Sequence, residues 1–408
     1  MNKVTQISTN SFNGGAGIAA LRLHNEINKS NSYKSYFYTE FIKQKSLIEN
    51  NIFENKFRTI FRKINSKLFK QFAKNIFLNE NLESFSYSPF YFSKNLSNLS
   101  SSDIYHLHWF QHEFINLRDI NKLPNNRIVW TLHDCWPIQG TEHYVLKKDQ
   151  TNKIYLKLKM RIKNYKKNLI KNKNIHLVAP SKWMKEEALN SFENFTPNIT
   201  VIPNAIPDIF FKELRKNKAR KLLNLPLDKT LVLFSSLGGL KDKRKGIEII
   251  IDLIKYLHNE SSIEFITIGP FQEIIKINKE MIHYLGKIND LKKLFHIYKA
   301  TDMVLVPSLI DNLPQVATEA QACGRPIVCM RNGGLKDIVI NKKTGFFSKD
   351  RNPKNFTQQI NNVIKNGLLN EAESKYISKR AKSLWSGKVI REAHINLYND
   401  MLKFNHQK

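Results

Sequence analysis

The chain has 408 residues, of which 41% are hydrophobic and 11% aromatic, a composition that excludes a disordered protein and suffices for two folded domains. Its 65 lysines and arginines against 35 aspartates and glutamates give a formal charge of +30, which indicates either an anionic partner or only a lysine-rich composition. The sequence has no zinc-ligand spacing or other nucleic-acid-binding motif, so we expect no nucleic-acid partner.

The predicted elements of the first half of the chain alternate between strands and helices. The first strand, residues 4–8, is followed by the glycine-rich segment 13–17 and then by a helical pattern, as in the first unit of a doubly wound α/β domain. Further strands are predicted at residues 104–108, 128–132 and 176–179. Ser181 is a suitable N-cap for the helix that follows the last of these.

The alternation starts again after residues 201–207, where two prolines bracket a short extended segment. The predicted strands of the second half are residues 231–235, 264–268, 303–306 and 326–330. The predicted helices are residues 247–257, 291–298 and 315–322. Two successive series of βα units indicate two Rossmann-like α/β domains, and ligands of such domains bind at the carboxyl ends of the strands.

Two histidines lie in the predicted strand 104–108. We expect His106 and His108 to face opposite sides of this strand, and we interpret both as structural rather than catalytic residues. Three cysteines, Cys135, Cys323 and Cys329, have neither a disulfide framework nor metal-ligand spacing, which is typical of a reducing compartment. The first 20 residues do not read as a secretory signal and no segment is apolar enough to span a membrane, so we expect a cytoplasmic protein.

The segment 307–320 has the clearest functional pattern. It follows an apolar strand and begins a helix whose first turn contains Pro314, a residue suited to that position. The free N–H groups of such a turn can bind an anion, for example a pyrophosphate. Asp311 precedes the helix and Glu319 lies about one and a half turns into it, so the two carboxylates can bind hydroxyls at separate points of one ligand. A capped helix with one solvated glutamate would show the same pattern.

This segment resembles the acidic-x7-Glu motif of glycosyltransferase family 4, whose members are retaining enzymes with a GT-B fold. The motif runs from Asp311 to Glu319 and continues with Ala320, Cys323, Gly324 and Pro326. The resemblance covers nearly the whole chain and includes residues 14–17, 103–109, 130–134, 201–207 and 245–246. It implies an acceptor-side domain at residues 1–202, a nucleotide-sugar-binding domain at residues 203–384 that faces it across a cleft, and a helix, residues 385–408, that returns to the first domain.

The resemblance also implies roles for single residues. Glu319 would hold the ribose hydroxyls of the donor, and Asp311 would contact hydroxyls of the transferred sugar. Lys245 would bind the donor phosphates, with Arg244 or Lys241 in place of the family's arginine. His133, at the end of an apolar strand, would lie over the reacting sugar and either bind a hydroxyl or stabilise positive charge. The other implied donor-binding residues are Gly14, Gly15, Asn312, Leu313, Gly286 and Lys287, and we expect His133, Asp311 and Lys245 to be catalytic.

The implied reaction transfers a sugar from a UDP- or GDP-sugar to a glycan or polyprenyl-linked acceptor, with retention and without an obligatory metal. The product would belong to a capsule, exopolysaccharide or lipopolysaccharide. Because the leaving group is a diphosphate, the site must mainly neutralise charge and position the acceptor. Two alternatives remain open at this point: a GT-B-like nucleotide-sugar epimerase, and a non-catalytic scaffold that binds glycans or nucleotides.

Residues 53–77 combine a stripe of phenylalanines, isoleucines and leucines at three- and four-residue steps with lysines and arginines at the other positions. Such a helix lies in the interface of an anionic membrane or packs as an ordinary core-facing helix on the first domain. A second basic stretch, residues 147–173, and the charge of +30 favour a peripheral position at the inner face of the plasma membrane.

Overall fold

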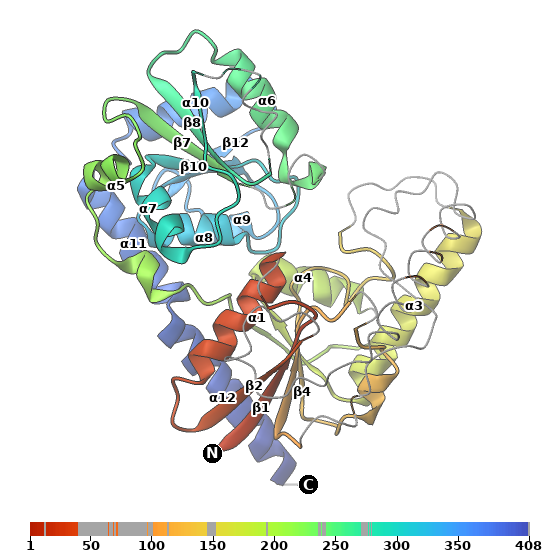
Figure 1. Ribbon diagram of the computed structural model, residues 1–408. Helices are drawn as coiled ribbons and strands as arrows, with labels where there is room; N and C mark the ends of the chain where they lie inside the picture. The colour runs from red at the N-terminus through yellow and green to blue at the C-terminus, as the bar shows by residue number, and fades with distance from the viewer. Residues whose placement is uncertain are drawn as a thin grey trace. The chain divides into compact units, whose positions relative to one another are not determined.

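The structure is a computed structural model, and it describes residues 1–11, 14–39, 64, 68, 71, 96, 101–111, 114–144, 152–192, 195–235, 238, 242–270, 276, 278 and 280–406. The chain divides into two compact units, each built around one six-stranded sheet (Figure 1). Unit 1 comprises Met1–Pro203 and Ile390–Lys408, and unit 2 comprises Asn204–Val389. Every strand pairing in both sheets is parallel.

The sheet of unit 1 has the strand order β2-β1-β3-β4-β5-β6. Its strands are β1 (Asn2–Ile7), β2 (Tyr33–Tyr38), β3 (Ile104–Leu107), β4 (Ile128–Thr131), β5 (His176–Ala179) and β6 (Ile199–Val201). Its α-helices are α1 (Gly14–Ile27), α3 (Lys153–Asn172) and α4 (Lys182–Ser191), together with α12 (Gly387–His406) from the end of the chain. Ser181 caps α4 as predicted, because its side chain accepts a hydrogen bond from the Met184 N–H at 3.1 Å.

The two faces of the unit 1 sheet are packed differently. Tyr105 and Leu107 of β3 point into an apolar core that includes side chains of α3 and α4. His106 lies between them and faces the other side, where its Nδ1 lies 2.7 Å from the hydroxyl of Tyr398 on α12. Helix α12 is also tied to β2 through Tyr33, whose hydroxyl donates to Asn399 at 2.8 Å. One face of the sheet is therefore apolar, and the face under α12 is polar.

The sheet of unit 2 has the strand order β12-β11-β10-β7-β8-β9. Its strands are β7 (Thr230–Ser235), β8 (Ile263–Ile268), β9 (Ile282–Tyr284), β10 (Met303–Val306), β11 (Ile327–Met330) and β12 (Gly345–Ser348). In the sheet, β8 and β9 follow β7 on one side, and β10, β11 and β12 follow it on the other side. This is the 3-2-1-4-5-6 strand order of a dinucleotide-binding Rossmann sheet. The order reverses between β7 and β10, so ligands are expected at the carboxyl ends of these two strands.

Helices cover both faces of the unit 2 sheet (Figure 1). They are α5 (Lys216–Leu222), α6 (Ile247–Tyr256), α7 (Leu291–Ala300), α8 (Gln315–Ala322), α9 (Leu335–Ile338), α10 (Pro353–Lys365) and α11 (Glu371–Trp385). Leu231 and Leu233 of β7 belong to the core that includes residues of α7, α8 and α11, whereas Val232 and Phe234 belong to the core with α6 and α10. Alternate side chains of one strand thus belong to two apolar layers. Because both faces of these strands are buried, their sequences are continuous hydrophobic runs.

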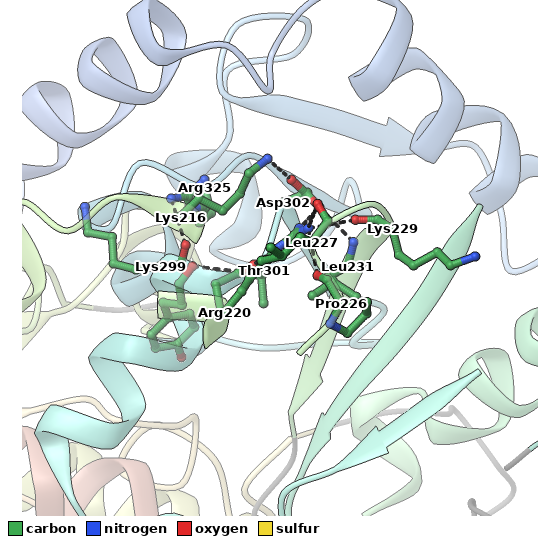
Figure 2. Close-up of polar contacts among 12 residues, drawn as sticks. Lys216, Arg220, Pro226, Leu227, Lys229, Leu231, Lys299, Thr301, Asp302 and Arg325 are labelled. Carbon is green, nitrogen blue, oxygen red and sulfur yellow. Dashed lines mark hydrogen bonds and ion pairs between the residues drawn. The ribbon is translucent and has the colours of Figure 1, made fainter. Parts of the chain in front are cut away.

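A buried ionic cluster closes the end of the unit 2 sheet at which β7 and β10 begin (Figure 2). Asp302, immediately before β10, accepts hydrogen bonds from Arg220 at 2.5 Å, from Lys216 at 2.6 Å and from the Leu231 N–H at 2.7 Å. Arg220 is 1% exposed and also donates to the backbone carbonyls of Ala300, Pro226, Leu227 and Lys229. The cluster ties α5 to the sheet at the edge opposite the expected ligand-binding edge.

The prediction of two Rossmann-like α/β halves is confirmed. Residues 176–179, 303–306 and 315–322 form the predicted elements with the predicted bounds. Pro314 lies at the N-cap of α8, one position before the expected first turn. Of the segment 53–77 the structure describes only residues 64, 68 and 71, so its interpretation as an amphipathic helix lies outside the described residues.

Candidate functional site

Two loops meet at the point in unit 2 where the strand order reverses. The loop after β7 ends in a short 3₁₀ turn, Lys243–Lys245, and the loop after β10 contains Asp311. Lys245 Nζ donates a hydrogen bond to the Asp311 carboxylate, and the Arg244 guanidinium lies 3.7 Å from the same oxygen. Arg244 also donates to the carbonyl of Ile310 at 3.1 Å. Residues 66 positions apart in the sequence therefore form one charged cluster.

Glycines allow these loops to approach each other closely. Gly246 has φ +74°, and a Cβ at this position would lie 2.2 Å from the carbonyl oxygen of Pro307. Gly333, which follows β11, has φ +48°, and a Cβ there would lie 2.2 Å from the carbonyl oxygen of Asp311. A side chain at either position would push the loops apart, so both glycines are required for the cluster.

Asp311 is buried and ionised. Burial alone would raise the pKa of its carboxyl, but the charges of Lys245 and Arg244, with hydrogen bonds from Lys245 and from the Asn312 backbone, hold the pKa below its ordinary value. The cluster places the cations Lys245 and Arg244 and the fixed carboxylate of Asp311 next to the start of α8, and Arg244 also donates to the Asp242 carboxylate at 3.1 Å. Such a set of charges suits an anionic ligand that also carries hydroxyl groups.

Helix α8 brings Glu319 into the interior of unit 2. Glu319 is 4% exposed, and its Oε2 accepts a hydrogen bond from the Tyr298 hydroxyl at 2.9 Å. The alternative of a solvated glutamate is therefore wrong. Asn312 and Leu313, which precede the helix, are also buried, so the loop before α8 is fixed by packing. A buried carboxylate held by a tyrosine from α7 is a rigid acceptor for hydrogen bonds.

The remaining predicted donor residues lie at separate places. Gly286 follows β9, has φ +66° and accepts a hydrogen bond from the Gly269 N–H at 3.0 Å, and Lys287 beside it is exposed. Gly14 and Gly15 begin α1 in unit 1 and are exposed, and a Cβ on Gly14 would meet no atom within 4 Å. The close backbone contact of this turn is made by Gly17, where a Cβ would lie 2.6 Å from the carbonyl oxygen of Asn10. The ligand contacts of these glycines stay predictions.

His133 follows β4 in unit 1, at the carboxyl end of that strand. Its Nε2 lies 2.9 Å from Nδ1 of His108, and Nε2 of His108 lies 2.7 Å from Oε1 of Gln6 on β1. Burial lowers the pKa of His133 to about 4, with Asp134 acting weakly in the opposite direction. The imidazole is therefore neutral at neutral pH, which favours a hydrogen bond to a hydroxyl over the stabilisation of positive charge.

The expectation that His106 and His108 face opposite sides of their strand is wrong. Residues two apart on a strand share a face, and the two rings stack with centroids 4.3 Å apart and an angle of 20° between their planes. Both rings are buried on the polar face of the sheet. His108 also contacts His133, so it belongs to the surroundings of a predicted catalytic residue.

The sequence pattern did not reveal a carboxylate–imidazole pair beside His133. Asp134 Oδ2 lies 2.6 Å from Nδ1 of His143, and the ring of His143 stacks on the indole of Trp109. Burial would raise the pKa of Asp134, but His143 and the Trp136 N–H hold it below its ordinary value. The signal in the sequence is the run of polar residues directly after an apolar strand.

Residues 215–383, all in unit 2, match the model of the family described as "Glycosyl transferases group 1". This part of the chain is therefore similar to glycosyltransferase group 1 domains. The chain is also 24% identical over 268 residues to a lipopolysaccharide 1,2-N-acetylglucosaminetransferase of Salmonella typhimurium, covering 60% of this chain and 67% of that protein. The chain spans about half to two thirds of the length of such curated relatives.

Solved structures show the fold of the whole chain. It is similar to sucrose-phosphate synthase from Thermosynechococcus elongatus, with a TM-score of 0.69 and 17% identity over 99% of this chain and 100% of that chain. It is also similar to HepE of Anabaena in complex with UDP-glucose, with a TM-score of 0.63 and 14% identity over 98% of this chain and 100% of that chain. The chain has the GT-B fold.

Proposed function

We propose that this chain is a retaining glycosyltransferase of family 4 that transfers a hexose from a UDP- or GDP-sugar to a glycan or polyprenyl-linked acceptor in surface-polysaccharide synthesis. The observation that carries the proposal is the ion pair between the buried Asp311 and the half-buried Lys245, with Arg244 beside it. The pair lies at the strand-order reversal of a unit that matches the glycosyltransferase group 1 model. A lipopolysaccharide transferase among the relatives and a UDP-glucose complex among the similar structures support the acceptor and donor classes.

In this proposal the donor binds to unit 2. Lys245 and Arg244 neutralise the diphosphate, and the N–H groups at the start of α8 add a favourable dipole. Asp311 accepts hydrogen bonds from hydroxyls of the transferred sugar, and Glu319, oriented by Tyr298, accepts those of the ribose. Gly286 and Lys287 lie near the nucleobase. The family resemblance assigns His133 to a hydroxyl of the transferred sugar.

The chemistry then requires little beyond electrostatics and position. The bond between the anomeric carbon and the diphosphate breaks, and its electrons pass to the diphosphate. The acceptor hydroxyl oxygen forms the new glycosidic bond, and its proton passes to the departing diphosphate. Two cations beside Asp311 stabilise the charge on the leaving group as it develops. Retention is the outcome expected from the family resemblance.

Chelation tests the expectation that no metal is obligatory. Because Lys245 and Arg244 supply the positive charge that a divalent cation would otherwise bring to the diphosphate, transfer in EDTA should equal transfer in Mg²⁺ within about twofold. The measurement is release of nucleoside diphosphate, with and without EDTA. A loss of activity in EDTA that Mg²⁺ restores would contradict this part of the proposal.

Removal of each of the two carboxylates is expected to impair a different step of the reaction. Glu319→Ala loses charge-assisted hydrogen bonds to ribose worth about 1.5–3 kcal/mol, so nucleotide binding should weaken about 10- to 100-fold. Asp311→Ala should lower kcat at least about tenfold and change the Kd for nucleotide by less than about threefold, because its proposed contact is with the sugar. Calorimetry with UDP, GDP and ADP and a transfer assay measure the two quantities.

The exposed Glu371→Ala serves as the control, since its ion pair with Lys375 is at the surface of α11. An oligonucleotide serves as the control ligand. If no nucleoside diphosphate raises the melting temperature of the wild-type chain, the transferase proposal fails. If a nucleotide sugar is converted with no acceptor present, the epimerase alternative is favoured instead.

We also propose a cytoplasmic location with peripheral contact to an anionic membrane. Among the described helices none is long and apolar enough to cross a membrane. Helix α3 exposes Ile154 and Met160, each 62% exposed, next to the exposed basic residues Lys157 and Arg161. An exposed mixture of apolar and basic side chains on one helix suits the headgroup region of anionic lipids.

Vesicle sedimentation tests this contact. Replacing Ile154 and Met160 together by glutamate should lower binding to vesicles of phosphatidylglycerol and phosphatidylcholine at least fivefold, since it adds two negative charges and removes two apolar side chains. Leu189→Glu, at a 37% exposed position on α4, is the control and should bind like the wild type. Equal binding to pure phosphatidylcholine, or an unaffected double variant, would contradict the proposal.

A further inference from the structure

A row of polar side chains crosses the face of the unit 1 sheet under α12 and ends at His133. Gln6 of β1 is fully buried, and its Oε1 lies 2.7 Å from Nε2 of His108. Nδ1 of His108 then lies 2.9 Å from Nε2 of His133. Buried parallel strands normally carry valine, isoleucine or leucine at such positions, and burying polar groups is unfavourable unless they are hydrogen-bonded. The side chains of this row must therefore be hydrogen-bonded to one another, and each of these hydrogen bonds has a direction.

The hydrogen bonds determine which nitrogen of each ring carries the proton. Burial lowers the pKa of both His108 and His133, so both rings are neutral at neutral pH, with one donor and one acceptor nitrogen each. The amide oxygen of Gln6 can only accept, so His108 is protonated on Nε2 and its Nδ1 is an acceptor. His133 must then donate from Nε2, and its Nδ1 is the unprotonated nitrogen.

The position of His108 is fixed from both sides. Its ring stacks on His106 at a centroid distance of 4.3 Å and on His133 at 5.2 Å. His106 is itself held at 2.7 Å by the hydroxyl of Tyr398 and at 2.7 Å by that of Thr131. A rotation of His108 would break its hydrogen bonds to Gln6 and His133, which favours a single geometry of the ring.

We propose that His108 and Gln6 are positioning residues that hold His133 as the neutral Nε2–H tautomer, so that His133 meets the transferred sugar as a hydrogen-bond acceptor through Nδ1. The proposal rests on the proposed function in one respect, the contact between His133 and the sugar. His108 and Gln6 act only through His133. Their effect is to select a sugar hydroxyl that donates to the imidazole, and to prevent the ring from turning its donor nitrogen toward the sugar.

The tautomer can be measured directly in the full chain. Two-bond ¹⁵N–¹H spectra of histidine-labelled protein distinguish protonated from unprotonated ring nitrogens, and His133→Gln assigns the signal. We expect His133 to be protonated on Nε2 in the wild type. Gln6→Leu, which removes the acceptor for His108, should give a mixture of both tautomers of His133. His108→Asn, whose amide oxygen can take the place of Nδ1, should retain the Nε2–H form.

The same variants separate a positioning role from a merely structural one. Gln6→Leu should lower kcat about tenfold with little change in the KM for the nucleotide sugar, whereas His108→Asn should keep most of the wild-type kcat. Thr5→Val is the matched control, because it removes another buried hydrogen bond of β1, the one to Ser102 at 2.7 Å, without touching the row. Thr5→Val should change the melting temperature but not the tautomer or the kcat.

A wild-type His133 protonated on Nδ1 overturns the inference, whether or not any variant folds. So does a Gln6→Leu variant with mixed tautomers and unchanged kcat. A wild type that has the Nε2–H tautomer but transfers no sugar contradicts the proposed function instead, and leaves the assignment of the tautomer supported.

Discussion

Lowering the pH from 7 to 4 is expected to unfold unit 1 while unit 2 keeps its structure. Burial lowers the pKa of His24, His133, His176 and His394 to about 4, and it lowers the pKa of His106 and His108 well below the ordinary value. All six histidines belong to unit 1. Unit 1 therefore contains a group of imidazoles that the folded state keeps neutral.

The direction of the effect follows from the two pKa values of each group. In the unfolded chain a histidine binds a proton below its ordinary pKa of 6.5, whereas in folded unit 1 it does so only near pH 4. Stability is therefore fully present above about pH 6.5 and is lost as the pH falls from there toward 4. His24 and His394 are each at least 95% buried, and each contributes a loss of about 3 kcal/mol over this range. Losses of this size are comparable to the whole stability of a domain.

Unit 2 has no comparable set of buried histidines among the residues that the structure describes. His258 is exposed, and His283 and His296 are half-buried. The two units can be followed separately, because Trp109, Trp130, Trp136 and Trp183 lie in unit 1 and only Trp385 lies in unit 2. Tryptophan fluorescence, and hydrogen exchange measured for individual peptides, should show that unit 1 unfolds at a higher pH than unit 2.

A matched pair of variants tests the cause. His394→Gln removes one of the buried titrating groups and should move the acid midpoint of unit 1 to lower pH. His258→Gln removes an exposed histidine of unit 2 and should leave that midpoint unchanged. A unit 1 that stays folded at pH 4, or an equal response of both variants, would show that buried histidines do not control acid stability.

The central strands of both sheets could be predicted from the sequence, but the edge strands could not. The strands absent from the prediction are β2, β6, β9 and β12, and these are the four edges of the two sheets. A central strand is buried on both faces and its sequence is an apolar run, whereas an edge strand is defined by its pairing with one neighbour. For β12 the pairing of Gly345 with Ile327 places a glycine in a strand that no local pattern would indicate.

The sequence predicts the residues of the candidate site better than it predicts the contacts between them. Asp311, Glu319 and Lys245 follow from a motif, but the motif says nothing of the hydrogen bond between Lys245 and Asp311, which depends on the strand order. The sequence analysis does not predict the row from Gln6 through His108 to His133, because it places His106 and His108 on opposite sides of their strand and interprets both as structural residues. The usable signal was the spacing of His106 and His108, two residues apart and hence on one face.

Asp302→Asn is expected to unfold unit 2 at a much lower temperature than the wild type, with little effect on unit 1. The Arg220 guanidinium is buried, and Asp302 is the only carboxylate that its described ion pairs include (Figure 2). Removing one partner leaves a buried charge without compensation, which costs about 3–5 kcal/mol. The substitution also weakens the acceptor for Lys216 and for the N–H group at the start of β7.

The double variant Arg220→Met, Asp302→Leu separates two causes of this instability. If the unpaired charge alone were responsible, replacing both residues by apolar ones would restore the stability, as it does for many buried ion pairs. Here Arg220 also donates to four backbone carbonyls, so the double variant leaves those carbonyls without a donor and should stay destabilised by at least about 2 kcal/mol. Differential scanning calorimetry measures both midpoints, with Glu371→Gln on the surface of α11 as the control that should leave them unchanged. A fully stable double variant would mean that Arg220 serves only as the counter-ion of Asp302, and a stable Asp302→Asn would mean that the cluster is not what joins α5 to the sheet.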